Sequence, residues 1–189
     1  MVPRLALGYQ QCRFSYTPDS RVIEIADTLR YKRIPCDAIW MDIDYMDGYR
    51  IFTFNPQGFP DPKAVNRDLH LRGFHSVWMI DPGAKAETGY SVYDSGTAND
   101  VWVKTVDGKE YNGDALPGKV AWPDFTDPKV CQWWGGLYKD FMAQGVDGVW
   151  NDVNEPQVSN TPTGTMPEDN LHRGGNGIPA GTHLQYHNV

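Results

Sequence analysis

Two carboxylates stand at the ends of short apolar runs, where their side chains could do chemistry. Asp42 follows the apolar residues 38–41, and Asp152 lies near the end of the run 146–153. A helix cap or a turn explains such residues poorly, because an unpaired carboxylate inside or beside a buried strand is costly. A carboxylate held there can attack an anomeric carbon as a nucleophile or bind a metal ion.

Strands that end at one edge of a sheet would position these carboxylates. We predict a strand that leads into a loop within residues 5–14, and strands in residues 38–41, 76–80 and 146–153. We predict helices from Asp19 to before Pro35, from Asp61 to Leu71, and from Asp127 to Gly145, with Asp19 and Ser20 as caps of the first. This alternation predicts an α/β fold of parallel βαβ units. In a (β/α)₈ barrel, the carboxyl ends of the strands form the active-site face.

Two segments depart from the alternation. Residues 89–120 are rich in Gly, Tyr, Val and Asp, and we interpret them as a β-rich insertion after the third strand. The part after Gln157 is dominated by Gly, Pro, Asn, Thr and His and predicts a long loop. We expect its histidines, including His172, to be solvated, and we assign no role to His75 at the start of the third strand.

Composition narrows the class of ligand. The net charge of −7 and the isoelectric point near 5.1 argue against binding to nucleic acid or to an anionic membrane surface. A neutral or cationic ligand fits better. Three distant cysteines match neither a zinc site nor a disulfide framework, and no apolar leader follows Met1. A reducing, cytoplasmic location is therefore the expectation.

The segment Trp-Asn-Asp-Val-Asn-Glu-Pro at 150–156 resembles the nucleophile signature of glycoside hydrolase family 31, in which Trp, any residue, Asp, an apolar residue, Asn and Glu follow one another. Further segments resemble other motifs of that family and follow in the family's order: 6–13, 40–46, 79–83 and 122–128. Together they cover essentially the whole chain. The resemblance implies a partial (β/α)₈ TIM barrel containing about the first four βα units.

The resemblance also implies a reaction, the exo-acting hydrolysis of α-glucosides with retention of configuration. Asp152 would be the nucleophile, and Asp42 would bind hydroxyls of the glucosyl unit in the −1 subsite. The remaining predicted sugar contacts are apolar: Ile43, Ile80, Trp122 and Trp150. No metal or organic cofactor is needed, and the partner would be an α-glucoside oligosaccharide. The Asn at position 151 resembles one form of the family motif, and this resemblance favours an α-glucosidase over an α-xylosidase.

One part of the family pattern has no counterpart here. The family's general acid is an Asp in a downstream Trp-x-Gly-Asp-Asn segment, whereas Gly113-Asp114 precedes the nucleophile and is followed by Ala115. We therefore expect residues 1–189 to be a partial catalytic barrel domain with an inserted subdomain at about 89–120 and without the C-terminal half of the barrel. Alone, this chain should have no glucosidase activity.

Two other functions remain open at this point. In a metal-dependent barrel enzyme, carboxylates at the strand ends would hold Mg²⁺ with waters: Asp42, Asp81, Asp152 and Glu155. In a non-catalytic carbohydrate-binding homologue, the same pocket would hold a sugar without turnover. Glu155 is equally compatible with a structural hydrogen bond, so we leave its role open.

Overall fold

The computed structural model describes residues 2–174, which fold as two compact units. The first unit takes the described residues up to Gly48, then Phe52–Ile80 and Lys139–Trp150. The second takes Tyr49–Ile51, Asp81–Tyr138 and the described residues from Asn151 onward. No helix in the part of the chain described here is both long and apolar enough to cross a membrane.

The first unit is built on a four-stranded sheet in the order β1-β2-β3-β7. Its strands are β1 (Gln10–Gln11), β2 (Ala38–Met41), β3 (His75–Ile80) and β7 (Gly148–Asn151). The first three pair in parallel, with Ala38 opposite His75 and Met41 opposite Trp78. The strands of this sheet lie in the order in which they occur along the chain, as in a (β/α) barrel, and the strands between β3 and β7 belong to another sheet. The predicted first strand is wrong in length, since Arg4–Leu7 forms a 3₁₀ turn instead.

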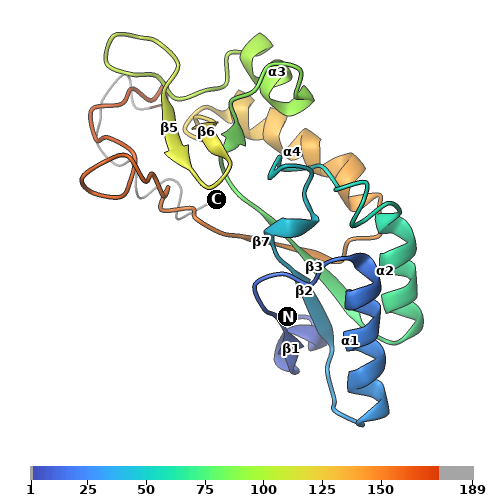
Figure 1. Ribbon diagram of the computed structural model, residues 1–189. Helices are drawn as coiled ribbons and strands as arrows, with labels where there is room; N and C mark the ends of the chain where they lie inside the picture. Colours follow the sequence, from blue (N-terminus) through green and yellow to red (C-terminus); the bar gives the residue numbers. More distant parts are fainter. Residues whose placement is uncertain (1, 175–189) are drawn as a thin grey trace. The chain divides into compact units, whose positions relative to one another are not determined.

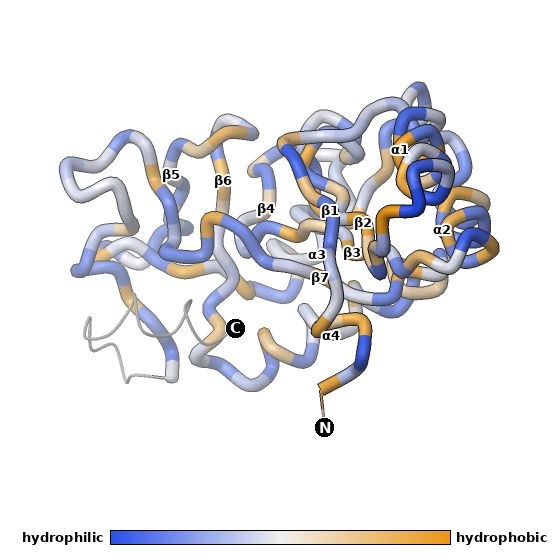
Figure 2. The backbone as a smooth tube through the Cα atoms, turned by 90° about the horizontal axis from the view of Figure 1, so that it is seen from below, coloured by the Kyte–Doolittle hydropathy of each residue, from blue (hydrophilic) through white to orange (hydrophobic). Residues whose placement is uncertain are grey.

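Helices α1 (Asp19–Tyr31) and α2 (Pro62–Leu71) lie side by side along these strands (Figure 1). Both alternate between hydrophilic and hydrophobic residues in Figure 2, as half-buried helices do. The start of α2 is the predicted one, because Asp61 caps it by accepting a hydrogen bond of 2.9 Å from the Ala64 amide. The predicted caps of α1 are wrong: Pro18 holds the N-cap position, without a side-chain bond.

An aromatic cluster fills the core of the first unit. Trp78 is fully buried, and its indole N–H donates to Asn66 Oδ1 over 3.0 Å. The amide of Asn66 in turn donates to the carbonyl of Gln144 over 2.8 Å, which joins α2 to the chain after α4 (Pro128–Met142). Rings within 4.8–6.4 Å of one another complete the cluster: Tyr45, Phe54, Phe59, Trp78 and Phe141.

The second unit contains a helix and a small antiparallel sheet. The sheet has the order β4-β6-β5, with β4 at Ala84–Lys85, β5 at Asn112–Ala115 and β6 at Gly118–Ala121. The segment 89–120 thus supplies two of its strands, but it also forms helix α3 (Ser91–Ala98), which the sequence did not predict. Gly96 of α3 lies against Trp102, and a Cβ there would come within 2.2 Å of the indole.

A buried hydrogen bond between His172 and Asp124 holds the loop after Gln157. His172 is only 3% exposed, and its Nδ1–H donates to Asp124 Oδ1 over 3.1 Å. Asp124 also accepts hydrogen bonds from the amide of Arg173 (2.7 Å) and the hydroxyl of Thr126 (2.7 Å). The prediction of a solvated His172 is therefore wrong. Residues 158–174 otherwise form no helix or strand, and the remainder of the predicted loop lies outside the described residues.

Candidate active site

Asp42 lies at the carboxyl end of β2, where the strand gives way to a 3₁₀ turn over Ile43–Tyr45. Its carboxylate caps this turn by accepting a hydrogen bond of 2.6 Å from the Ile43 amide. The Asp42 side chain is half-buried, whereas Ile43 is almost fully buried. The cap fixes the direction of the carboxylate at the end of the strand.

Two tryptophans connect the strand ends of the first unit through hydrogen bonds and a ring contact. Trp150, on β7, donates its indole N–H to the carbonyl of Met41 over 3.1 Å. Its ring centroid lies 5.8 Å from that of Trp40, whose own N–H donates to Gln10 Oε1 over 2.7 Å. These contacts join β1, β2 and β7 within two residues of Asp42. Both indoles are half-buried, so part of each ring surface remains accessible.

Asp152 follows directly after the last residue of β7 and belongs to the second unit. The side chain is exposed, and one carboxylate oxygen accepts a hydrogen bond of 2.9 Å from the Val153 amide. Val153 has a φ of 49°, a left-handed conformation that is unfavourable for a β-branched side chain. Strain of this kind costs about 1–3 kcal/mol and clusters at functional sites. The backbone next to Asp152 is thus strained, as at many catalytic positions.

Two other predicted sugar contacts are enclosed by their own units. Ile80 ends β3 and is fully buried in the first unit. Trp122 is 2% exposed and packs in the core of the second unit, where its ring stacks on Tyr111 at 5.6 Å. Their part in binding a sugar stays a prediction.

Sequence reasoning missed a neighbour of Asp42. Partial burial and, after it, the negative charge of Asp42 raise the pKa of the Cys12 thiol, so the charge of that carboxylate acts on Cys12. Cys12 directly follows β1, whose parallel pairing with β2 brings the two strand ends together. The parallel order of the first two strands was the one available signal.

Comparison with known proteins identifies the domain. The model of the glycosyl hydrolases family 31 TIM-barrel domain matches residues 1–189. The chain belongs to glycoside hydrolase family 31. The predicted α/β fold class, a partial TIM barrel, is thereby confirmed.

Individual family 31 proteins resemble this chain over most of its length. "Alpha-glucosidase 2" of Bacillus thermoamyloliquefaciens is 44% identical over 187 residues, which are 99% of this chain and 23% of the relative. The crystal structure of a family 31 alpha-glucosidase from Bacteroides thetaiotaomicron is 78% identical, with a TM-score of 0.79, over 89% of this chain and 29% of that one. A DNJ-bound glucosidase II alpha subunit is 38% identical, with a TM-score of 0.90. The match covers 96% of this chain and 20% of that one. The chain spans about a fifth to a third of the length of these proteins.

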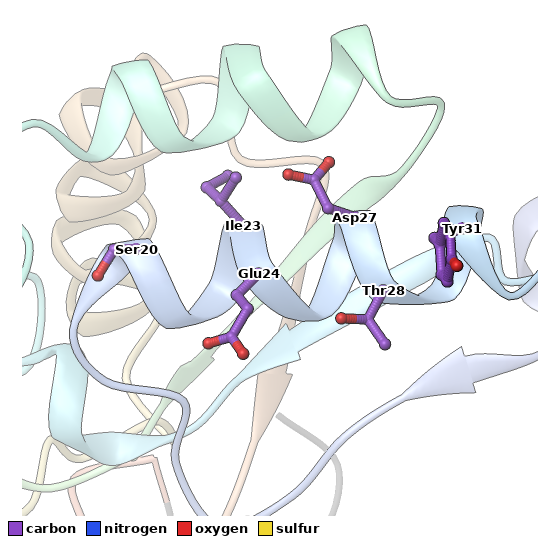
Figure 3. Close-up of a pocket in the computed structure, with 6 residues that line it drawn as sticks. All are labelled: Ser20, Ile23, Glu24, Asp27, Thr28 and Tyr31. Carbon is purple, nitrogen blue, oxygen red and sulfur yellow. The ribbon is translucent and has the colours of Figure 1, made fainter.

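The described residues also form a pocket along α1. None of the residues that line this pocket is a predicted site residue. It is lined by Ser20, Ile23, Glu24, Asp27, Thr28 and Tyr31. Ile23 and Asp27 project to one side of the helix, whereas Glu24 and Thr28 project to another (Figure 3). The carboxylate of Asp27 contacts Arg72, the residue directly after α2, at 2.6 Å. The strand ends, rather than this helix surface, carry the family 31 motifs.

Proposed function

We propose that the protein carrying this chain is a retaining, exo-acting α-glucosidase with Asp152 as its nucleophile. The observation that carries the proposal is the placement of this carboxylate in a family 31 barrel domain. Asp152 directly follows β7, is oriented by the Val153 amide and stands beside a strained backbone. The names of the relatives, which are alpha-glucosidases, support the same reaction.

In this proposal an oxygen of Asp152 attacks the anomeric carbon of a terminal α-linked glucose. The bond from that carbon to the leaving oxygen breaks, and a second carboxylic acid gives its proton to the leaving oxygen. Water, deprotonated by the same second carboxylate, then hydrolyses the glucosyl ester and releases glucose with its original configuration. The sequence contains no counterpart of the family's general acid, so this role is assigned to no residue here.

Asp42 is proposed to bind hydroxyl groups of the same glucosyl unit, with hydrogen bonds that strengthen as positive charge develops on the ring. The carboxylate is already oriented by the Ile43 amide at 2.6 Å. The half-buried indoles of Trp40 and Trp150 offer apolar surface at these strand ends, which suits the face of a sugar ring. Ile43, Ile80 and Trp122 remain proposed members of the apolar wall.

The test is covalent trapping of the full-length protein with a 5-fluoro-α-glucosyl fluoride, followed by mass spectrometry of the peptides. A glucosyl adduct on Asp152 is the expected result, and Asp152→Ala should abolish both adduct and turnover. Asp169→Ala is the matched control, because Asp169 is an exposed carboxylate further along the same loop. This control should label and turn over like the unaltered protein.

Each other outcome points to one of the alternatives. An active protein that takes no label on Asp152, and that loses activity with a chelator, would favour the metal-dependent reading. A folded full-length protein that binds saccharide without turnover would favour the binding homologue. The 189-residue chain alone should be inactive, and hydrolysis by it that disappears with Asp152→Ala would contradict that expectation.

A further inference from the structure

Three side chains with metal-binding atoms meet at the amino-terminal ends of β3 and β7, the opposite end from Asp42. His70 lies in the last turn of α2, His75 is the first residue of β3, and Asp147 directly precedes β7. Their ligand atoms all lie within 4.8 Å of one another. All three belong to the first unit, and none takes part in the proposed hydrolysis.

The carboxylate of Asp147 is held in place by the sheet. Its Oδ2 accepts a hydrogen bond of 2.9 Å from the amide of Ser76, while the Asp147 amide donates to the carbonyl of Ser76 over 3.1 Å. The same Oδ2 lies 2.6 Å from Nε2 of His70. The pairing of β3 with β7 therefore orients one of the three groups before any ligand arrives, as the supporting contacts of metal sites do.

His75 supplies the observation that points to a ligand. Its Nδ1 is buried and lies 3.1 Å from Oδ1 of Asp147, yet it makes no hydrogen bond of acceptable geometry. Buried polar atoms are nearly always satisfied, so an unsatisfied one calls for a partner. An imidazole nitrogen that gives up its proton to solvent has the lone pair that a metal ion needs, and Asp147 Oδ1 lies beside it as a second ligand atom.

Ligand chemistry selects the kind of ion. Two imidazoles and one carboxylate form a mixed nitrogen and oxygen set, which suits Zn²⁺ and leaves a fourth position for water. Mg²⁺ and Ca²⁺ prefer sites made of oxygens. The side chains of His70 and His75 are 40% and 46% exposed, so an ion can reach them from solvent. Binding would replace the contact between His70 and Asp147 by bonds from both residues to the metal.

We propose that His70, His75 and Asp147 form a surface site for a zinc-like divalent transition-metal ion, remote from the strand ends that carry the proposed active site. The competing explanation is a purely structural cluster in which Asp147 links two histidines by hydrogen bonds. The two explanations differ in their response to metal, because a structural cluster gains nothing from zinc.

The test is a calorimetric titration of chelator-treated full-length protein with zinc chloride alone, with magnesium chloride in parallel. One zinc ion per chain is expected, together with a higher midpoint of thermal unfolding in zinc and no effect of magnesium. His75→Gln and Asp147→Asn should each weaken zinc binding roughly tenfold or more. Asp68→Asn is the matched control, since Asp68 is a partly exposed carboxylate of the same helix α2, and the substitution should leave zinc binding unchanged.

A second readout protects the test against loss of folding. Co²⁺ bound by this ligand set should give visible absorption in the unaltered protein, and His70→Gln should remove it while circular dichroism stays unchanged. The proposal is overturned if zinc does not bind, or if it binds equally well to folded His75→Gln and Asp147→Asn proteins.

Discussion

The indole of Trp150 donates a hydrogen bond of 3.1 Å to the carbonyl of Met41, one residue before Asp42. This bond joins the end of β7 to the end of β2. Trp150 precedes Asp152 by two residues, so a single side chain connects the strand end that bears the proposed substrate ligand with the strand that leads to the proposed nucleophile. We propose that this contact gives Trp150 a positioning role in addition to its predicted apolar contact with the sugar.

Trp150→Phe should lower kcat/KM for an α-glucoside about fivefold in the full-length protein. The substitution keeps an aromatic ring but removes the hydrogen bond to Met41, and the loss of one such bond costs about 1 kcal/mol. Steady-state kinetics measures the effect. Trp133→Phe is the matched control, because it removes the bond of 3.2 Å from Trp133 to the Ser95 hydroxyl and should leave kcat/KM nearly unchanged. Equal losses in both variants would count against a positioning role.

Cys12 should report the charge of Asp42. Burial and the Asp42 carboxylate raise the pKa of this thiol, so little thiolate is present at pH 7.5 and alkylation is slow. Asp42→Asn removes the negative charge, lowers the pKa of Cys12 and should speed its alkylation by iodoacetamide about two- to fivefold. Mass spectrometry of the Cys12 peptide gives the rate, and Asp44→Asn is the control at the neighbouring carboxylate. An unchanged alkylation rate in Asp42→Asn would show that the charge of Asp42 does not affect the Cys12 thiol.

Local signals predicted the elements of the first unit well. The apolar run Ala38–Met41 forms β2 with those bounds, and the Asp61-Pro62 pair starts α2 as expected from its capping chemistry. Helix α3 was missed because Gly96 and three residues with short hydroxyl side chains disfavour a helix. Its stability comes from packing instead, since only glycine permits the approach of Trp102.

The sequence predicted those parts of the candidate site that lie within a single short motif of the chain. Asp42 and Asp152 lie where the strand pattern placed them, each hydrogen-bonded to the amide that follows it. Contacts between distant residues left no such signal. His172 is separated from Asp124 by 48 residues, and nothing near His172 in the sequence indicates that its ring is buried.

Arg30 should be a major source of stability in the first unit. Its guanidinium donates to the carbonyls of Arg72 (2.8 Å), Gly73 (2.9 Å) and Cys36 (3.0 Å), and it lies 3.6 Å from the centre of the Phe74 ring. Arg30→Met keeps the aliphatic chain but removes these bonds, so we expect a loss of about 2 kcal/mol in the free energy of unfolding by urea.

The control for Arg30 is Arg67→Met on α2. Arg67 is exposed and contacts only the side chain of its neighbour Asp68 in the described contacts, at 3.0 Å. Exposed pairs contribute little, so this variant should stay within about 0.5 kcal/mol of the unaltered protein. A similar loss in both variants would mean that the carbonyl contacts of Arg30 are energetically unimportant.

The buried carboxylate of Asp124 should make stability depend on pH. Burial alone would raise its pKa, but hydrogen bonds from His172, the Arg173 amide and Thr126 outweigh burial and hold the pKa below its ordinary value. Because the pKa is lower in the folded protein than in the unfolded chain, the contribution is complete above the unfolded value of about 3.9. It is lost as the pH falls through the folded pKa.

Asp124→Asn should therefore lower the free energy of unfolding by about 2 kcal/mol at pH 7, since it removes the charge that His172 and the Arg173 amide hydrogen-bond. The difference from the unaltered protein should shrink as the pH falls below about 4, where Asp124 itself becomes protonated. Urea unfolding at a series of pH values measures both effects, with exposed Asp169→Asn as the control. A difference that stays constant down to the lowest pH would show that the stability of this loop does not depend on the Asp124 charge.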